Sequence, residues 1–322
     1  MHEKLKPKIV VTRKIPTAVS DLLRANFNVE LNETDVPFSK KQLQSAVKRA
    51  DGILCTVSDQ IDSEVIKVKN SRISIISNFG VGVSNIDIEC AEHESLVVTN
   101  TPNVLTESTA EIALFLILAV SRKTTLSEDK LRRNLWKGFS IVDDLGISLS
   151  GKTLGIVGMG RIGKATARKV KNALNMEIIF HNRSRVTDKD AYGRQVETLD
   201  ELLTKSDIIS IHAPGGGDVP ILTEKDILKM KPSAYLINTA RGDVIDEKGL
   251  IKALKANQIG GAGLDVFESE PNVPEELLSL PNVTLLPHIG SATLQTREAM
   301  GFLAVNNLIA HFSDKNYPSR VI

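Results

Sequence analysis

The sequence predicts an α/β protein of two Rossmann-like or flavodoxin-like domains, each built on a parallel sheet, with an active-site cleft between them. Short runs rich in Val, Ile and Leu recur along the chain without alternating with polar residues, as expected for parallel strands buried on both faces. Helical patterns such as 39–50 separate these runs, which indicates βαβ units. The length of 322 residues corresponds to about two domains.

The expected strands fall into two groups along the chain. The first group is 8–12, 52–57, 73–77 and 96–99. The second group is 153–158, 176–181, 208–213, 234–240, 261–267 and 283–288. We therefore expect a discontinuous first domain, 1–100 plus 292–322, and a second domain, 101–291.

One long helical stretch, from about Ser108 to Trp136, separates the two groups. Ser108 and Glu111 have the spacing of a capping box, in which each side chain bonds a free backbone N–H group of the first turn. The run 112–120 is apolar on all sides, so this helix must be covered all round. We interpret it as a helix that joins the interface of a homodimer, and a deep core helix between the domains is the alternative.

Composition argues against a nucleic-acid partner. Lys and Arg total 40 against 39 for Asp and Glu, so the net charge of +1 provides no basic field for a polyanion. Aromatic residues make up only 4%, which leaves few rings on which bases could stack.

The sequence predicts neither a metal site nor a membrane segment. Cys55 and Cys90 lack metal-ligand spacing, and we expect both to be buried as small apolar side chains. Residues 1–16 lack the apolar segment of a signal peptide. The longest apolar run, 112–120, falls short of the ~18 residues of a membrane span. We therefore expect a cytoplasmic protein.

A glycine motif after the first strand of the second group predicts dinucleotide binding. Gly158, Gly160 and Gly163 follow a buried strand and open a helix. The first glycine permits a tight turn, the second lets the backbone approach a pyrophosphate, and the third lets helix and strand pack closely. The phosphates would then face the free N–H groups at the start of the helix, over Met159, Arg161 and Ile162. The alternative is a glycine turn that serves packing alone.

The next strand ends where an NAD enzyme usually carries an acidic residue, about 20 residues past the glycines. This chain has Asn182 there, followed by Arg183, Ser184 and Arg185. Two guanidinium groups suit a 2′-phosphate, which a carboxylate would repel. We therefore expect NADP(H) to be preferred, with NAD(H) possible, and a solvated basic turn is the alternative.

Three polar residues follow successive strands at the carboxyl ends, where ligands bind in open α/β sheets. Arg241 follows 234–240, Glu270 lies shortly after 261–267, and His288 ends 283–288. Each alone could be a surface, helix-entry or turn residue. Together they predict the reduction of a 2-oxo acid: His288 donates a proton to the oxygen that becomes negative, Glu270 orients the ring, and Arg241 grips the carboxylate. Asp265 is a candidate to hold the nicotinamide, or a structural cap.

The chain resembles the D-isomer-specific 2-hydroxyacid dehydrogenases over nearly its whole length. Within that family it is most similar to the glyoxylate/hydroxypyruvate reductase and glycerate dehydrogenase branch. The resemblance is carried by the segments 78–88, 99–111, 151–163, 237–246, 263–271 and 285–293.

The resemblance implies further site residues. Val81 and Gly82 match the loop whose backbone N–H groups hold the substrate carboxylate, and Val57 matches a pocket-lining position. Trp136 matches a residue that in some relatives reaches the partner subunit, with packing as the alternative. The remaining cofactor contacts that we expect are Thr109, Ala213, Pro214, Thr239, Ala240 and Gly290.

The chain departs from the family pattern at two places. The family has a polar Thr/Glu-rich turn where this chain has the glycine-rich segment 215–220, which leaves the cofactor contacts of that loop open. Asn134 stands where relatives often have glycine.

The predicted activity is the NADPH-dependent reduction of glyoxylate or hydroxypyruvate, with a small 2-oxo or 2-hydroxy acid as the partner. A dinucleotide-sensing corepressor and a dehydrogenase for a bulkier 2-oxo acid are the alternatives.

Overall fold

The computed structural model describes residues 6–187 and 191–322, so the first five residues of the N-terminal stretch assessed above lie outside it. The chain forms two compact units. One unit holds Met1–Leu105 and Ala292–Ile322, and the other holds Thr106–Ser291. The sequence placed the first junction near residue 100 and the second near residue 291.

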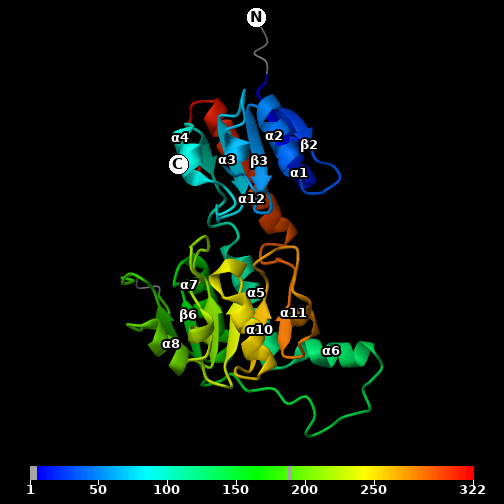
Figure 1. Ribbon diagram of the computed structural model, residues 1–322, viewed down its shortest axis with the longest axis vertical. Helices are drawn as coiled ribbons and strands as arrows, with labels where there is room; N and C mark the ends of the chain where they lie inside the picture. The colour runs from blue at the N-terminus through cyan, green and yellow to red at the C-terminus, as the bar shows by residue number, and fades with distance from the viewer. Residues whose placement is uncertain (1–5, 188–190) are drawn as a thin grey trace, which may run out of the picture. The chain divides into compact units, whose positions relative to one another are not determined.

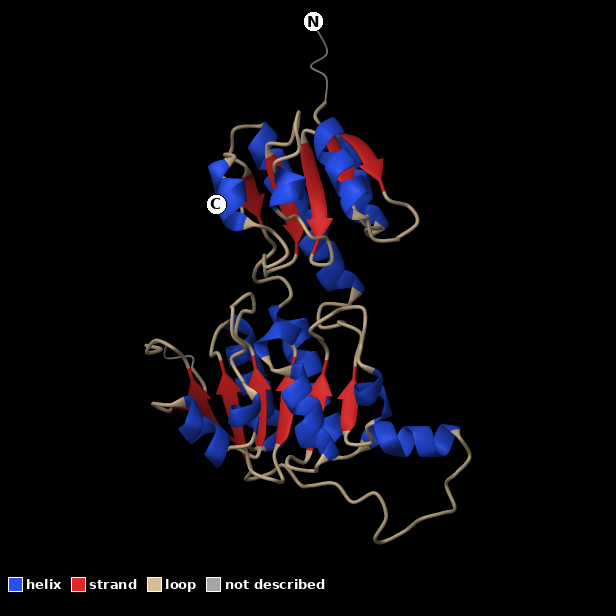
Figure 2. Ribbon diagram, viewed as in Figure 1, coloured by secondary structure: helices blue, strands red, loops and turns tan. Residues whose placement is uncertain are grey.

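The first unit contains a five-stranded sheet in the order β2-β1-β3-β4-β5, and every pair in it is parallel (Figures 1 and 2). This is the flavodoxin-like order. Its elements are β1 (Lys8–Val11), α1 (Thr17–Asn26), β2 (Asn28–Leu31), α2 (Lys40–Arg49), β3 (Gly52–Thr56), α3 (Ser63–Ile66), β4 (Ile75–Phe79), α4 (Ile88–His93), β5 (Val97–Thr99) and α12 (Leu294–Phe312).

Each strand of this sheet supplies side chains to two cores, because successive residues point to opposite faces. Val10 and Ile53 pack toward α2, α3 and α4, whereas Ile9 and Leu54 pack toward α1 and α12. This explains why the strands are apolar without alternation. Helix α12 approaches α1 so closely that a Cβ on Gly301 would lie 2.4 Å from a methyl of Val19, and the C-terminal segment therefore belongs to this unit.

The second unit contains a seven-stranded parallel sheet in the order β12-β11-β10-β9-β6-β7-β8. The order reverses between β6 and β9, the switch point where Rossmann folds bind dinucleotides. The elements are α5 (Thr106–Ser121), α6 (Thr124–Arg132), β6 (Thr153–Val157), α7 (Arg161–Leu174), β7 (Glu177–His181), β8 (Arg194–Gln195), α8 (Leu199–Lys205), β9 (Ile208–Ile211), α9 (Glu224–Ile227), β10 (Tyr235–Asn238), the 3-10 helix η1 (Gly242–Val244), α10 (Glu247–Lys255), β11 (Gly261–Leu264), α11 (Glu275–Ser279) and β12 (Val283–Leu285).

Helices cover both faces of this sheet (Figure 2). Helices α5 and α7 pack on one face, in a core that includes Leu154 and Ile156 of β6. Helices α8, α9 and α10 pack on the other face, in a core that includes Val157. The prediction of two parallel-sheet α/β units is confirmed. Of the described strands, the sequence missed β2 and β8. Both are short strands at sheet edges, where little of the strand is buried and few apolar residues mark it.

The predicted long helix is wrong in two respects. It is two helices, α5 and α6, separated at Lys123, whose φ of 53° no α-helix accommodates. The capping box is absent, because α5 begins at Thr106 and Ser108 lies inside its first turn. Phe115 and Leu118 of α5 are exposed in the single chain, so the coverage predicted for this helix on all sides would need a second copy.

The two cysteines are free and buried, as predicted. In the described part of the chain, no helix combines the length and the apolar character that crossing a membrane requires.

Candidate active site

The glycine motif forms the turn between β6 and α7 at the switch point of the second sheet. Gly158 has a φ of 94°, and a Cβ there would lie 2.9 Å from the backbone N of Ala213 on the loop after β9. A Cβ on Gly163 would lie 2.3 Å from the carbonyl oxygen of Gly158, so only glycine lets α7 approach the strand this closely. Both positions require glycine for internal packing.

Gly160 is different, because a Cβ there would meet no atom within 4 Å. Its φ of −79° is accessible to any residue, and as the N-cap of α7 it adds no side chain to the helix start. The open space therefore lies in front of the N-terminal turn formed by Gly160, Arg161 and Ile162, where the helix dipole favours an anion. This cradle fits a dinucleotide pyrophosphate.

Asn182 follows β7, and its side chain contacts the glycine turn between β6 and α7. Its Oδ1 accepts the backbone N–H of Met159 at 2.6 Å, so the side chain is directed at the glycine turn. Arg183 and Arg185 are exposed, and no carboxylate partner of either lies within the described residues. Gln195 on β8 holds this turn by donating to the carbonyl oxygen of Ser184 at 3.1 Å. Two guanidinium groups without a carboxylate partner among the described residues therefore stand on an anchored turn next to the cradle.

His212 directly follows β9 and lies beside Gly158, and the sequence analysis assigned it no role. Burial lowers the pKa of His212 to about 4, so the ring is neutral at physiological pH. Its Nε2 shares a hydrogen bond of 2.9 Å with the Ser210 hydroxyl, and its buried Nδ1 has no partner in the part of the chain described. The ring is a packing element of the turn next to the glycine motif.

Arg241 lies on the turn after β10, and Asn238 at the end of that strand shapes the turn. The Asn238 side chain donates to the carbonyl oxygen of Arg241 at 2.7 Å and accepts the N–H of Ala240 at 3.0 Å. Burial lowers the pKa of Arg241, and the charges of Glu270 and Asp243 act in the opposite direction. The guanidinium group is thus half-buried and faces two carboxylates, which keeps it charged.

Glu270 and His288 contact each other directly. The ring N–H at Nδ1 of His288 donates to Oε2 of Glu270 at 2.7 Å, and Oε1 of Glu270 accepts the N–H of Phe267 at 3.1 Å. Burial raises the pKa of Glu270, but the hydrogen bond and charge of His288 outweigh this, and the net pKa is lowered. The ring is therefore oriented by an ionised carboxylate, and its Nε2 is left to meet a ligand.

Asp265 is 1% exposed at the end of β11 and binds the turn that follows β12. Its two oxygens accept the N–H groups of Ile289 at 2.7 Å and Gly290 at 2.8 Å. A Cβ on Gly290 would lie 3.1 Å from Asp265 and 3.4 Å from Thr109 of α5, so these three residues are in close contact. Of the two roles that the sequence allowed for Asp265, the geometry is that of a structural anchor, although it holds a turn rather than a helix.

The loop after β9 is anchored rather than loose. Asp243 accepts the N–H of Gly216, and a Cβ on Gly215 would lie 2.2 Å from Oδ1 of Asp243. Pro214 lies at the start of this loop and is exposed. Thr239, on the neighbouring turn after β10, is 7% exposed, and its hydroxyl has no hydrogen-bond partner among the residues that the structure describes. The glycines therefore serve contact with Asp243, a residue that sequence reasoning missed.

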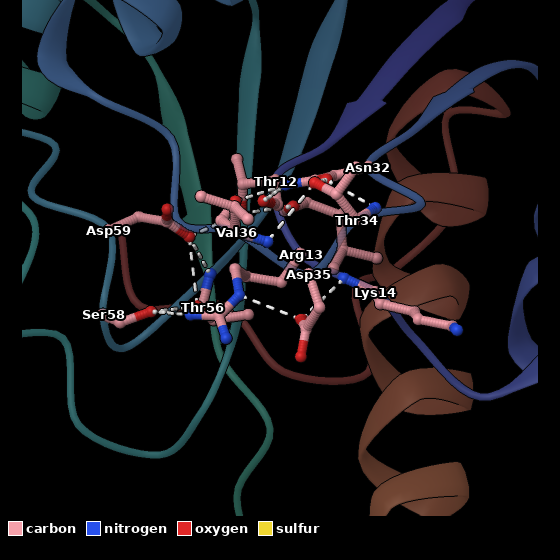
Figure 3. A network of polar contacts seen from close by, with 11 residues as sticks. Thr12, Arg13, Lys14, Asn32, Thr34, Asp35, Val36, Thr56, Ser58 and Asp59 are labelled. Atoms are coloured by element: carbon pink, nitrogen blue, oxygen red, sulfur yellow. Dashed lines mark hydrogen bonds and ion pairs between the residues drawn. The ribbon is translucent and has the colours of Figure 1, made fainter.

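In the first unit, Val57 lies on the turn after β3, and a buried carboxylate fixes that turn (Figure 3). Asp59 accepts the hydroxyl of Thr12, the backbone N–H of Thr56 at 2.8 Å and the hydroxyl of Thr56 at 3.1 Å. Arg13 bridges the same region by donating to Asp35 and Ser58. Val81 and Gly82 lie on the turn after β4, the next strand of the sheet, so all three positions share its carboxyl edge.

Comparison with known proteins identifies the family. The family model described as "D-isomer specific 2-hydroxyacid dehydrogenase, NAD binding domain" matches residues 114–290. A glyoxylate reductase of Pyrococcus furiosus is 43% identical over 95% of this chain and 92% of its own length. The chain belongs to the D-isomer-specific 2-hydroxyacid dehydrogenase family. As a member of that family, it is an NAD(P)-dependent oxidoreductase of the glyoxylate reductase branch.

Solved structures of other 2-hydroxyacid dehydrogenases have the same fold. A putative NAD-binding member from Polaromonas superposes with a TM-score of 0.91, at 34% identity, and covers 99% of this chain and 100% of the other. An NADPH-dependent glyoxylate/hydroxypyruvate reductase of Sinorhizobium meliloti, solved with NADP and malonate, gives a TM-score of 0.87 at 35% identity, over 98% of this chain and 97% of the other.

The open space at Gly160 gives a test of the cofactor cradle in this dehydrogenase. Gly160→Ala should leave the melting temperature unchanged, because no atom lies within 4 Å of the added methyl group. It should raise the Kd for NADPH at least ~10-fold, because the methyl group occupies the approach of the phosphates to the helix N-terminus. Binding can be measured by nucleotide fluorescence.

Gly163→Ala is the matched comparison, since its Cβ would lie 2.3 Å from the Gly158 carbonyl oxygen. That variant should lose both thermal stability and NADPH affinity. Unchanged NADPH affinity in Gly160→Ala would contradict the assignment of the cradle.

Proposed function

We propose that this enzyme reduces a small 2-oxo acid, glyoxylate or hydroxypyruvate, to glycolate or the D-2-hydroxy acid with NADPH. The observation that carries the proposal is the 2.7 Å hydrogen bond between His288 and Glu270 at the carboxyl edge of a dinucleotide-binding sheet. Arg241 follows β10, the strand next to the one that Glu270 follows. The activities for which the Pyrococcus and Sinorhizobium relatives are named support the same substrate class.

Each of the three side chains has a defined task in the proposal. NADPH, when bound, supplies the hydride to the carbonyl carbon. His288, protonated at both nitrogens, gives the proton at Nε2 to the carbonyl oxygen as negative charge develops there. Glu270 stabilises the imidazolium and fixes its plane through Nδ1. Arg241 binds the substrate carboxylate through two parallel hydrogen bonds.

The proposal includes a preference for NADPH over NADH. Arg183 and Arg185 are exposed on the turn after β7, where a carboxylate that would repel a 2′-phosphate is replaced by Asn182. Asn182 itself is occupied with the N–H of Met159, so the two arginines are the side chains offered to the phosphate. The Sinorhizobium reductase was solved with NADP, which is consistent with this preference.

A substrate and cofactor panel tests the function. Glyoxylate, hydroxypyruvate and phenylpyruvate are offered with NADPH and NADH, and the loss of the reduced nicotinamide is followed by absorbance. We expect the highest kcat/KM for one of the two small acids with NADPH, and His288→Ala should abolish turnover while NADPH still binds. Preference for phenylpyruvate would indicate a bulkier substrate, and no turnover with any acid would favour a dinucleotide-sensing role.

The cofactor preference has its own variants in the same assay. Replacing both Arg183 and Arg185 with Ala should raise the KM for NADPH at least ~10-fold, because even one hydrogen bond to a charged group is worth about 1.5–3 kcal/mol. The KM for NADH should stay unchanged. Arg132→Ala, an exposed arginine on α6, is the control. A kcat/KM for NADH equal to or above that for NADPH in the unmodified enzyme contradicts the preference.

The proposal also includes a homodimer formed through α5 and the segment after α6. Trp136 is 60% exposed, Phe139 91% and Ile141 81%, and α5 adds Phe115 and Leu118. A monomer rarely exposes apolar side chains in such number along one stretch. Because these residues need a complementary apolar surface, the occupant with the right chemistry is the same segment of a second copy, related by a two-fold axis.

Charged substitutions in this segment test the dimer. The double variant Phe139→Asp, Ile141→Asp should convert a dimer into a monomer at micromolar concentration, because two desolvated carboxylates would face an apolar surface. Light scattering after size exclusion measures the mass. Val36→Asp, which alters an exposed apolar residue of the first unit, should leave the dimer intact. A monomeric unmodified protein, or a double variant that stays dimeric, contradicts the proposal.

A further inference from the structure

We propose that Asn78 and Asn100 are positioning residues that fix the loop Gly80–Val83 so that its N–H groups face a substrate carboxylate. The inference rests on the proposed function, which gives the substrate a carboxylate, and on the carboxylate-binding role that the family resemblance implies for Val81 and Gly82. It extends that role to two side chains that touch neither substrate nor cofactor. It also brings the C-terminal segment into substrate binding.

The backbone carbonyl oxygens of this loop are all engaged by the first unit. Gly80 accepts the N–H of Thr101 at 2.9 Å, and Val83 accepts the N–H of Ile86 at 2.9 Å. Between them, Val81 accepts the Asn100 side-chain amide at 2.8 Å, and Gly82 accepts the Asn78 side-chain amide at 2.9 Å. Four successive carbonyl oxygens are thus tied to the domain, two of them by asparagine side chains.

The N–H groups of the loop have the opposite arrangement. Within the residues that the structure describes, the backbone N–H groups of Val81 and Gly82 have no acceptor, and both residues are only half-buried. The plane that carries a residue's carbonyl oxygen also carries the N–H of the next residue, on the opposite side. The bonds to the oxygens of Gly80, Val81 and Gly82 therefore direct the N–H groups of Val81, Gly82 and Val83 outward, and those of Gly82 and Val83 are set by Asn100 and Asn78. Successive outward N–H groups form a concavity that binds anions, so fixing the carbonyl oxygens also aims the N–H groups.

Asn78 is held in the one orientation that permits this contact. Its side chain is fully buried at the end of β4, and its Oδ1 accepts the side-chain amide of Asn85 at 3.4 Å. The Asn85 amide also donates to the carbonyl oxygens of Thr56 and Asp59, each at 3.1 Å, which sets its own orientation. Because Oδ1 faces the Asn85 amide and also accepts the Cys55 thiol at 3.6 Å, the donor Nδ2 of Asn78 faces Gly82.

Asn100 is held from the opposite end of the chain. Its backbone carbonyl oxygen accepts the Ser319 hydroxyl at 2.6 Å and the Asn307 side chain of α12 at 3.3 Å. Asn307 is fully buried and also accepts the N–H of Ser319 at 3.0 Å. The C-terminal segment therefore fixes Asn100, and Asn100 fixes the peptide of Val81.

A neutral donor is essential at both positions. Aspartate in place of Asn100 has no N–H to give, and its charge would repel both the Val81 carbonyl oxygen and an incoming carboxylate. The peptide would then be free to rotate, and the loop would have to be ordered at each binding event. The loss should appear in substrate binding and leave the cofactor cradle of the second unit intact.

Asn100→Asp tests the inference by steady-state kinetics with glyoxylate and NADPH. We expect the KM for glyoxylate to rise at least ~10-fold, kcat to stay within ~3-fold and the KM for NADPH to be unchanged, because only carboxylate binding is altered. Inhibition by oxalate, a carboxylate probe without a reducible carbonyl, should weaken in parallel. Asn26→Asp is the matched control, since Asn26 also donates to a backbone carbonyl, that of Leu22 at 2.9 Å, but on exposed α1.

Two further variants provide the test if Asn100→Asp does not fold. Asn100→Ala removes the donor without adding a charge, and Ser319→Ala removes only a hydroxyl that holds Asn100, so both should raise the KM for glyoxylate, the second by less. A glyoxylate KM within ~2-fold of the unmodified enzyme in all folded variants overturns the positioning role, as does a parallel fall in kcat and NADPH affinity. An unmodified enzyme that reduces no 2-oxo acid would instead overturn the proposed function.

Discussion

The buried carboxylate of Asp265 fixes the turn on which the Glu270–His288 pair depends. Its two bonds to Ile289 and Gly290 hold the backbone after His288, whose φ of 53° is a left-handed conformation that costs about 1–2 kcal/mol in a residue with a side chain. Burial raises the pKa of Asp265, while the N–H groups and the charge of His288 oppose that rise. The turn is thus strained, and the two hydrogen bonds to Asp265 hold it in the conformation that places the imidazole of His288 against Glu270.

At other strand ends, too, a polar side chain fixes the turn or loop beside it by hydrogen bonds to its backbone. Asn238 holds the turn that carries Arg241, Asn182 holds the glycine turn, and Asn78 holds the loop after β4. A short amide or carboxylate at the end of a strand reaches only the backbone next to it, and Asp265, Asn238 and Asn78 are buried, so they cannot exchange that partner for water. Within each unit, the parallel sheet gathers its strand ends at one edge. Hydrogen bonds from strand-end side chains therefore hold these loops within each unit.

The sequence predicted the two parallel-sheet units and the residues that follow the strands, because buried strands have an unmistakable apolar pattern and ligands bind at their carboxyl ends. It could not predict the break at Lys123, since a left-handed residue between two helical segments leaves no periodic signal. The roles of Asn78, Asn238 and Asp243 were also missed, because a polar residue next to a strand reads as an ordinary turn until its backbone partner is known. Asn134 has a φ of 58°, which explains why asparagine replaces the glycine of relatives there.

The most direct test of the account is the pH profile of kcat in Glu270→Gln. The lowered pKa of Glu270 keeps its carboxylate charged near neutral pH. In the proposed mechanism, that charge stabilises the imidazolium that donates the proton. Without that charge, kcat should fall by about 10- to 100-fold, and the decline on the alkaline side of the profile should begin at a lower pH. Glu268→Gln, an exposed neighbour, is the control. An unshifted profile with an unchanged kcat would contradict the role of this pair.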